Sequence, residues 1–509
     1  MSATTTRQTR KPTIAIVGTG FGGLAAAIEL RRNGFDDLII FERSDEVGGV
    51  WQANTYPGAA CDVPSPYYSF SYEPNPQWPR RFSPQAAILD YLKDVATKYE
   101  VRPHIRFGTE IASAVFDDTT TRWTLRTTAG DTVEVDIVIS AVGQLSRPSW
   151  PAIPGREAFR GESFHSAQWD HSVDLSGKRV VVVGTGASAV QFVPEIQSKV
   201  GKLTLVQRSA PYILPRLDTM YSALHQSIFR RLPLTQRAER ATWWAVTESL
   251  LVAFLYSRPL SRAVQSVSRA HMRRQVRNPD LLRKVWPDYP VGCKRTLFSS
   301  NYLPALVQPN VEVVTDRITA ITADAVVTAD GTSHPADVII YGTGFAASDF
   351  LAPMQITGSN ARDLRSQWTD GAHAYLGISV PNFPNLFLMY GPNTNLGSGS
   401  VVSMHECQAR YIRQAVQHIA ATDSPIAVKP EAEAEFDAKT QAKMTNGVWS
   451  MCNSWYRAAD GRVAANWPGT ASEYRWRTAK FDPAAYERVP AVATLGVDDL
   501  DEPTVMSGR

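Results

Sequence analysis

Cysteine is scarce in this 509-residue sequence, which contains Cys61, Cys293, Cys407 and Cys452 and has no CxxC motif. Cysteines placed so far apart are typical of a chain from a reducing compartment, and they argue against a disulfide framework or a structural zinc site. The sequence therefore predicts a cytoplasmic protein that is not held together by disulfides and that binds no metal.

Long hydrophobic runs are also lacking. No apolar stretch approaches the ~20 residues that a membrane-spanning helix needs, so we expect no stable membrane insertion. The first residues are polar and contain no apolar core of a signal peptide, which predicts a disordered tail over residues 1–11.

A strong excess of one charge is absent as well. The chain has 52 Lys and Arg against 49 Asp and Glu, a formal net charge of +3. No basic cluster accompanies a nucleic-acid-binding motif, so nucleic acid is not an expected partner. A chain of 509 residues is too long for one hydrophobic core, which predicts two or three domains.

Near the N-terminus, an apolar run is followed by Gly18, Gly20 and Gly23 in G-x-G-x-x-G spacing. A helical stretch and a second apolar run ending at Glu42 complete a β-α-β pattern. Glycines let a pyrophosphate approach the helix N-terminus, where backbone N–H groups favour anions, and Glu42 can accept hydrogen bonds from a ribose diol. The pattern predicts a dinucleotide site; a tight turn without a ligand is the alternative.

A second β-α-β pattern begins at residues 178–183. Gly184 and Gly186 follow in G-x-G-x-x-A spacing, and Ser188 opens the next helix. The following strand ends near Arg208, where an NAD-specific site more often has an acid. Arginine binds a ribose 2′-phosphate bidentately, so the pattern favours NADPH, with a solvated surface arginine as the alternative. Two such loops are typical of a flavoprotein with FAD at the first and NADPH at the second.

Small and aromatic residues follow the first pattern. Gly49 lets the backbone approach a cofactor closely, and Trp51 offers a flat surface. Asp62 lies in an otherwise apolar and small-residue run. A carboxylate in such a run is either paired with a cation or functional, and a turn-capping aspartate is the alternative.

Residues 159–170, FRGESFHSAQWD, lie between the two loops and fit the pattern F-x-G-x-x-x-H-x-x-x-W-D. Residues 49–62 fit G-x-W-x-x-x-x-Y-P-G-x-x-x-D. Together the patterns resemble the fingerprints of the type I Baeyer–Villiger monooxygenases, class B flavoprotein monooxygenases related to the flavin-containing monooxygenases. For residues 159–170 the alternative is a structural role, with His165 as a hydrogen-bonded linker histidine and Trp169 as a core anchor.

The resemblance, which covers roughly residues 12–485, implies roles for further residues. Lys294 would contact NADP, and Arg295 would lie over the flavin near Asp62, which makes Arg295 and Asp62 the expected catalytic residues. Asn393 lies in a stretch that resembles the family's loop near the flavin ring, and Trp455 in one that resembles the mobile loop over NADP.

The resemblance also implies the reaction. An NADPH- and O₂-dependent enzyme would insert an oxygen atom next to a ketone carbonyl through a flavin peroxide, giving an ester or lactone, and sulfides would be further substrates. Three alternatives stay open: a monooxygenase acting on sulfur or nitrogen, an NADPH-dependent flavin reductase, and a non-catalytic redox-sensing flavoprotein. Ala60 stands where many members have an arginine, which makes the anionic pocket less basic.

The expected fold class is α/β, with two Rossmann-like dinucleotide-binding domains. An arginine-rich helical insertion is expected in the NADPH domain, with its apolar stretch buried in the core; a substrate entrance or a surface resting on a membrane is the alternative. The predicted divisions are an FAD domain at 12–145 and 380–509, an NADPH domain at 146–216 and 296–345, the insertion at 217–295 and a connecting segment at 346–379.

Overall fold

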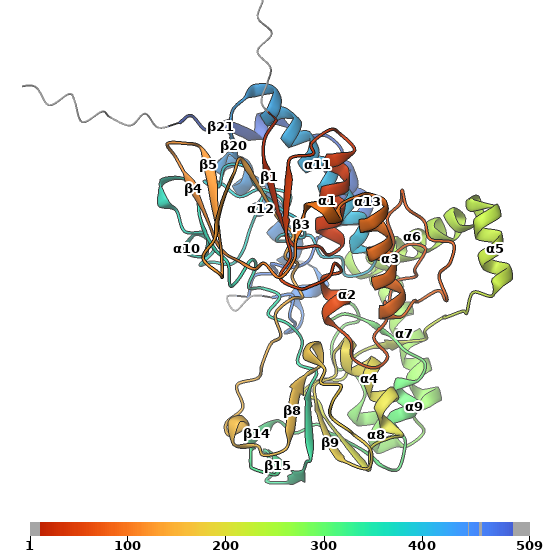
Figure 1. Ribbon diagram of the computed structural model, residues 1–509. Helices are drawn as coiled ribbons and strands as arrows, with labels where there is room; N and C mark the ends of the chain where they lie inside the picture. Colours follow the sequence, from red (N-terminus) through yellow and green to blue (C-terminus); the bar gives the residue numbers. More distant parts are fainter. Residues whose placement is uncertain (1–10, 446, 458–460, 492–509) are drawn as a thin grey trace, which may run out of the picture.

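The computed structural model describes residues 11–445, 447–457 and 461–491. Apart from Lys11, the predicted N-terminal tail lies outside the described residues. The described chain forms two lobes, each with a five-stranded parallel sheet, and a group of helices on one side (Figure 1).

The sheet of the first lobe carries the N-terminal β-α-β unit. Its strand order is β19-β7-β1-β2-β3, and all neighbours are parallel. The central strands β1 and β7 are buried on both faces, as strands of a covered parallel sheet are. The strands are β1 Ile14–Val17, β2 Leu38–Phe41, β3 Ile105–Arg106, β7 Ile137–Ser140 and β19 Leu386–Leu388.

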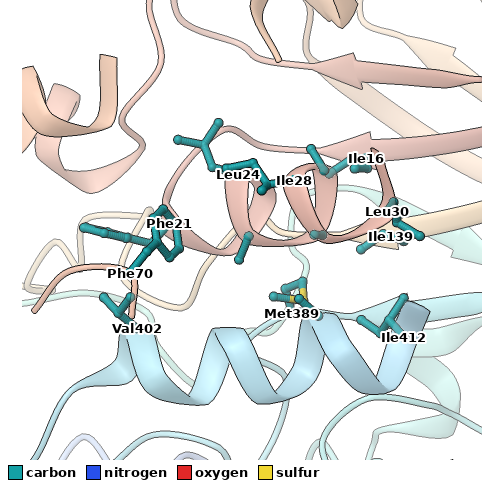
Figure 2. Close-up of a cluster of buried hydrophobic side chains, with 14 of the residues drawn as sticks. Ile16, Phe21, Leu24, Ile28, Leu30, Phe70, Ile139, Met389, Val402 and Ile412 are labelled. Atoms are coloured by element: carbon teal, nitrogen blue, oxygen red, sulfur yellow. The ribbon is translucent and has the colours of Figure 1, made fainter. Parts of the chain in front are cut away.

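Helices α1 (Phe21–Arg31) and α11 (Val401–Thr422) pack against each other beside this sheet, although they are far apart in the sequence (Figure 2). Alanines 25–27 of α1 are buried, and such small residues permit a close approach of helices. Phe21 and Ile28 of α1 and Ile412 of α11 belong to one buried hydrophobic cluster, and Met389 lies between the two helices (Figure 2). The C-terminal part of the chain therefore completes the core that the N-terminal unit begins.

The sheet of the second lobe has the order β13-β10-β9-β17-β8, again parallel throughout. Helix α4 (Ala187–Gln197) follows β9 as the second nucleotide pattern predicts. The strands are β8 Glu162–His165, β9 Arg179–Val183, β10 Lys202–Val206, β13 Val311–Val314 and β17 Val338–Tyr341.

Antiparallel strands flank both sheets. Turns at Gly130 and Gly331 join β5 to β6 and β15 to β16, and both glycines have positive φ angles. These strands are β4 Ile111–Asp117, β5 Arg122–Thr127, β6 Thr132–Val135, β14 Ile318–Ile321, β15 Ala325–Thr328 and β16 Ser333–Pro335. Strand β18 (Gln355–Thr357), from the predicted connecting segment, pairs with β4 and so extends the first lobe. The exact domain boundaries stay predictions.

The insertion is helical, as expected, and consists of α5 (Ala223–Arg231), α6 (Pro233–Tyr256), α7 (Arg258–Gln275) and α8 (Pro279–Lys284). The expectation that its apolar stretch is core is only partly correct. Leu251 and Phe254 are buried, whereas Trp244, Val252 and Tyr256 are exposed on the same helix. The helix therefore has apolar side chains on its packed side and on its outer side.

The remaining elements are short or peripheral. Among the described residues, no helix is both long enough and apolar enough to cross a bilayer. The elements are α2 Val50–Ala53, α3 Gln85–Lys98, α9 Tyr302–Leu306, α10 Leu364–Gln367, α12 Pro430–Thr445, α13 Ala471–Arg477, β11 Ile213–Leu214, β12 Leu297–Phe298, β20 Ile426–Val428 and β21 Tyr486–Arg488.

Candidate active site

The first glycine-rich loop connects β1 to α1. Gly18 has a φ of +105°, and a Cβ atom there would lie 2.6 Å from the carbonyl oxygen of Ala141. A Cβ atom on Gly23 would lie 1.9 Å from the carbonyl oxygen of Gly18. Since neither position has room for a side chain, the loop turns tightly in front of α1, as a pyrophosphate site at a helix N-terminus requires.

Gly49 brings a second segment to this loop. It has a φ of +55°, and a Cβ atom there would lie 3.0 Å from the Cα atom of Gly20. Two residues later, on α2, Trp51 donates from Nε1 to the hydroxyl of Tyr68 at 3.3 Å. The structure thus joins two of the predicted cofactor loops through Gly20 and Gly49; cofactor contacts of these residues stay predictions.

Glu42 follows β2 and is buried next to the first glycine loop. One carboxylate oxygen accepts from the backbone N–H and the hydroxyl of Thr19 at 3.0 and 2.5 Å. The other accepts from the backbone N–H and the hydroxyl of Ser44 at 2.9 and 2.8 Å. These bonds fix the carboxylate in place. The hydroxyls of a ribose diol would have to donate to the same two oxygens that already accept from Thr19 and Ser44. The ribose contact therefore stays a prediction.

The second glycine loop has the same construction. Gly184 has a φ of +103°, and a Cβ atom there would lie 2.5 Å from the carbonyl oxygen of Gly342. Gly186 precedes α4 with extended backbone, and Ser188 lies in the first turn of that helix. A dinucleotide phosphate at this helix N-terminus is consistent with the predicted role of Gly184, Gly186 and Ser188.

Residues of the second fingerprint, 49–62, contact helix α4. The hydroxyl of Tyr56 donates to Oε1 of Gln191 at 2.8 Å, and Nε2 of Gln191 donates to the carbonyl of Ala60 at 2.8 Å. Gly58 is packed so closely that a Cβ atom would lie 2.8 Å from the backbone oxygen of Gln191. The Tyr-Pro-Gly part of the pattern therefore attaches the first lobe to the second. Gln191 was missed by sequence reasoning, since a lone glutamine in a helix carries no signal.

A basic cluster lies beside the second loop. Lys294 Nζ donates to Oγ of Ser209 at 2.7 Å and lies 4.5 Å from the ring centre of Tyr289. Burial, and then the charge of the neighbouring Arg208, lower the pKa of Lys294 below its ordinary value. Two cations held close together favour an anion between them, so Arg208 and Lys294 suit a 2′-phosphate. Ser209 was not singled out from the sequence.

The two predicted catalytic residues are in direct contact, although they are 233 residues apart in the sequence. Arg295 donates from Nε to Oδ2 of Asp62 at 2.9 Å and from Nη2 to Oδ1 and Oδ2, each at 2.7 Å. The charge of Asp62 is the main reason that the pKa of Arg295 lies above its ordinary value. Within the described residues, Nη1 of Arg295 donates no hydrogen bond. The pair therefore fixes the guanidinium and leaves donors for another oxygen.

This pair forms part of the wall of a narrow cavity of about 60 Å³. The side chains of Asp62 and Arg295 are partly accessible, with 22% and 27% of their surface exposed. Most other lining side chains are apolar and come from the first lobe, the insertion and the segments directly before and after it. These lining residues include Phe82, Leu214, Trp243, Val246, Leu250, Phe254 and Phe298. The arrangement suits an apolar molecule with one oxygen directed at Arg295.

The fingerprint stretch at residues 159–170 does more than connect the two nucleotide loops, because its residues 162–165 form the edge strand β8. His165 is fully buried, and its Nδ1 accepts from the backbone N–H of Ala167 at 3.1 Å. Burial lowers the pKa of His165, which favours the neutral form of the ring. Trp169 packs against Phe164 and Phe192. These contacts favour the structural alternative for both residues.

Known proteins resemble this chain along almost its whole length. A family model described as flavin-binding monooxygenase-like matches residues 11–232. A Baeyer–Villiger monooxygenase of Streptomyces coelicolor is 41% identical over 496 residues, covering 96% of this chain and 95% of the relative. One of Pseudomonas aeruginosa is 42% identical over 477 residues, covering 93% and 90%. The chain belongs to the Baeyer–Villiger monooxygenase family.

Solved structures similar to this family member agree along almost the whole chain. An oxidized steroid monooxygenase bound to NADP superposes with a TM-score of 0.83 at 29% identity, covering 94% of this chain and 99% of the other. A closed cyclohexanone monooxygenase superposes with a TM-score of 0.83 at 28% identity, with the same coverage. The predicted fold class, α/β with parallel sheets of the Rossmann type, is confirmed.

The family's flavin fits the first lobe of this chain. Two buried polar atoms have no hydrogen-bond partner in the part of the chain that the structure describes: Oγ of Ser140, the last residue of β7, and Oε1 of Gln144, just after this strand. Buried polar groups are normally paired, so a polar ligand at the carboxyl end of this sheet would satisfy them. Nε2 of Gln144 donates to the carbonyls of Tyr390 and Gly391 at 2.9 and 3.2 Å, which fixes the side chain there.

Asn393 and Trp455, assigned to cofactor loops by resemblance, have different surroundings. Nδ2 of Asn393 donates to the carbonyls of Val463 and Asn466 at 2.7 and 2.9 Å, so this buried side chain positions the C-terminal segment. Trp455 is partly exposed, and its ring centre lies 4.4 Å from that of Tyr456. Direct cofactor contacts of Asn393 and Trp455 stay predictions.

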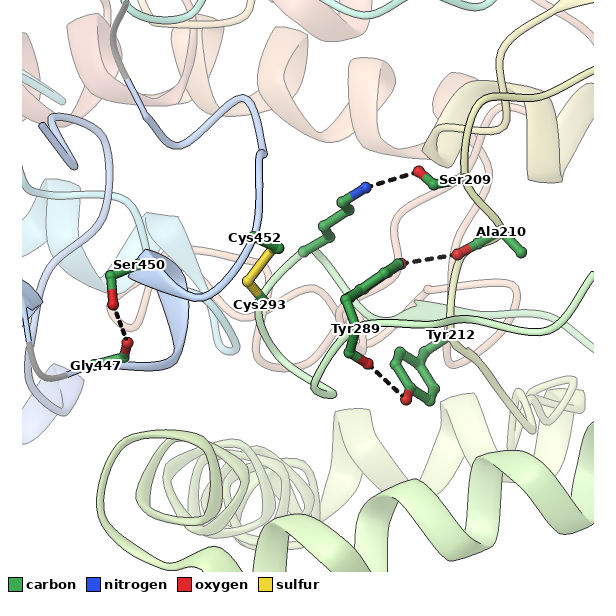
Figure 3. The surroundings of a disulfide bond; sticks show 9 residues. Ser209, Ala210, Tyr212, Tyr289, Cys293, Gly447, Ser450 and Cys452 are labelled. Atoms are coloured by element: carbon green, nitrogen blue, oxygen red, sulfur yellow. Dashed lines mark hydrogen bonds between the residues drawn. A yellow bond between two sulfur atoms is a disulfide. The ribbon is translucent and has the colours of Figure 1, made fainter. Parts of the chain in front are cut away.

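One expectation from the sequence is wrong: Cys293 and Cys452 form a disulfide, with their Cα atoms 6.1 Å apart (Figure 3). Cys293 directly precedes Lys294 and Arg295, and Cys452 lies three residues before Trp455. The bond therefore ties the predicted mobile loop to the edge of the active site. Cysteines separated by 159 residues give no pairing signal in a single sequence. Cys61 and Cys407 are buried free thiols.

Proposed function

We propose that this chain catalyses the NADPH- and O₂-dependent insertion of one oxygen atom next to the carbonyl of an apolar ketone, to give an ester or lactone. The observation that carries the proposal is the Arg295–Asp62 pair in the wall of an apolar cavity. Membership of the Baeyer–Villiger monooxygenase family supports the reaction, and FAD and NADPH are its cofactors.

The cofactors would be held by the two glycine loops and their surroundings. Bound FAD supplies the oxidative chemistry with O₂, using electrons from NADPH. Gly18, Gly20, Gly23, Glu42 and Gly49 surround the place for FAD, and the basic residues Arg208 and Lys294 that for the 2′-phosphate of NADPH.

Arg295 would act on the ketone oxygen. During oxygen insertion, negative charge develops on this atom, and a fixed donor such as Nη1 stabilises that charge without reorienting. Asp62 is a positioning residue, because it orients Arg295 and favours its charged form. The apolar lining excludes water, which strengthens the electrostatic effect of Arg295 and suppresses side reactions.

Two finer points belong to the same proposal. Sulfides of similar apolarity are further substrates, because the lining residues other than Asp62 and Arg295 are mostly apolar and make no specific demand for a carbonyl. A cytoplasmic location is proposed because the reaction consumes NADPH, although the Cys293–Cys452 disulfide removes the support that scattered cysteines gave.

Product analysis tests the proposal. The purified protein with NADPH and O₂ is offered a panel of ketones and thioethers, and the products are identified by mass spectrometry. Esters or lactones support the proposal. Sulfoxides alone indicate a heteroatom monooxygenase, and NADPH consumption without any oxygenated product indicates a flavin reductase.

A further inference from the structure

The helical insertion carries the positive charge of this chain. The helical part of the insertion, residues 217–285, contains twelve Lys and Arg and four Asp and Glu, a formal net charge of +8, whereas the whole chain has +3. The rest of the chain is therefore net negative. A concentration of like charge on one segment attracts anionic surfaces within about a Debye length.

The junction of α5 and α6 presents arginines and leucines side by side. Residues 230–234, Arg-Arg-Leu-Pro-Leu, are all exposed, and we call this stretch the α5–α6 corner. Leu232 is 60% exposed and Leu234 is 72% exposed. Helix α5 lies at the outer edge of the molecule, away from both sheets (Figure 1). The leucines of the corner therefore have no packing role in the described chain that would explain them.

The outer side of α6 continues this apolar surface. A surface helix normally has charged and polar residues on its outer side. On α6, the exposed residues are mainly small or apolar, namely Leu234, Ala238, Ala241, Trp244, Ala245, Val252 and Tyr256. Exposed apolar residues beside arginines are typical of helices that lie in the interface of a bilayer, where tryptophan and tyrosine are also favoured.

Helix α7, which packs on α6, has the same character. Its exposed residues include an apolar set at a spacing of three or four residues and arginines beside that set. The apolar set is Leu260, Ala263, Val267 and Ala270, and the exposed arginines are Arg258, Arg262, Arg273 and Arg274. The combination of apolar and basic residues is thus a property of the whole insertion and not of one turn.

We propose that the α5–α6 corner and the outer side of α6 dock on the surface of an anionic lipid bilayer, with leucines below the headgroups and arginines at the phosphates. The charge of the insertion decides between this occupant and a second copy of the chain. A two-fold dimer through this surface would bring two segments of net charge +8 together, whereas anionic lipid neutralises them. The docking needs no helix across the bilayer.

The position of α6 gives the docking a consequence for the enzyme, and this step rests on the proposed function. Trp243, Val246 and Leu250 of α6 line the active-site cavity, and Val246 is also exposed at the surface. The same helix thus borders both the docking surface and the cavity beside Arg295. A ketone dissolved in the bilayer would reach the cavity along α6 without passing through water, so the substrate class is lipid-soluble ketones.

Vesicle binding tests the docking independently of activity. The intact protein is sedimented with sucrose-loaded vesicles of phosphatidylcholine alone, or of phosphatidylcholine and phosphatidylglycerol in equal parts. The test variant is Leu232→Glu/Leu234→Glu. Its control is Val115→Glu/Val307→Glu, which changes the net charge equally at two residues outside the insertion that are 43% and 42% exposed. A third variant, Arg230→Gln/Arg231→Gln/Arg237→Gln, removes only charge. NADPH oxidation in solution checks that each variant is folded.

The wild type and the control are expected to bind the anionic vesicles, and the leucine variant to bind at least about tenfold more weakly. Each lost arginine is expected to weaken this binding about fivefold, with little effect on phosphatidylcholine alone. The proposal is overturned if the wild-type protein does not bind anionic vesicles, or if the leucine variant and the control bind them equally. A dimer in sedimentation analysis that the leucine variant dissociates, without vesicle binding, assigns the surface to a second copy. None of these outcomes depends on ester formation.

Discussion

Replacing Arg295 with alanine is expected to separate oxygen insertion from cofactor reduction. The guanidinium is held by three contacts of 2.7–2.9 Å to Asp62 and is 27% exposed, so it is a fixed cation in a mostly apolar cavity. Loss of one fixed donor to a developing oxyanion costs about 2.7–4 kcal/mol, or a hundred- to a thousandfold in rate. Reduction of FAD by NADPH requires no such charge at the ketone and should continue.

The assay measures three quantities on the same sample: ester by gas chromatography, NADPH by absorbance, and hydrogen peroxide. For Arg295→Ala, we expect loss of ester, continued NADPH oxidation, and peroxide in place of product. Arg295→Lys should retain partial activity, since lysine keeps the charge but not the paired geometry with Asp62. Ester formation at the wild-type rate by Arg295→Ala would refute the role, and bound FAD, checked by absorbance, distinguishes a local effect from misfolding.

The other predictions concern the cofactor site, the disulfide and a buried histidine. Arg208→Ala should raise the Michaelis constant for NADPH about ten- to a hundredfold and leave that for NADH nearly unchanged; equal effects would contradict the 2′-phosphate contact. Cys452→Ser should lower the urea midpoint of unfolding relative to a Cys407→Ala control. The Cys293–Cys452 bond joins residues 159 apart, and closing such a loop stabilises the folded state by up to about 5 kcal/mol. An unchanged midpoint under oxidising conditions would show that the bond does not stabilise the fold. Burial lowers the pKa of His405 from 6.5 to about 4, so the unfolded state binds the proton more readily. The free energy of unfolding has its full value above pH 6.5 and falls by up to about 3 kcal/mol as the pH drops toward 4, because the unfolded state takes up the proton first. His405→Gln should therefore flatten the pH dependence of the unfolding midpoint in this window.

Local pattern was sufficient for much of the fold. The glycine spacing after β1 and β9 and the acid at Glu42 identify two β-α-β units, because short-range rules govern a strand, a tight turn and a helix. The direct contact of Asp62 with Arg295 was implied by resemblance alone. Nothing local in the sequence brings together residues 233 positions apart.

What the sequence did not reveal depends on contacts between distant segments. Gln191 and Ser209 matter through partners on other elements, Tyr56 and Lys294, and neither has a distinctive local pattern. Strand β8 is defined by pairing with β17, about 175 residues later. The outer side of α6 has an apolar composition that also suits a buried helix, so sequence alone does not distinguish the two.

Oxygen isotope labelling measures the central claim most directly. The protein is incubated with NADPH, an apolar cyclic ketone and ¹⁸O₂ in unlabelled water, and the product is analysed by mass spectrometry. Oxygen insertion next to the carbonyl predicts a lactone with one ¹⁸O atom at the ring oxygen, and none when Arg295 is replaced by alanine. Product without the label, or labelled lactone formed equally by Arg295→Ala, would contradict the account.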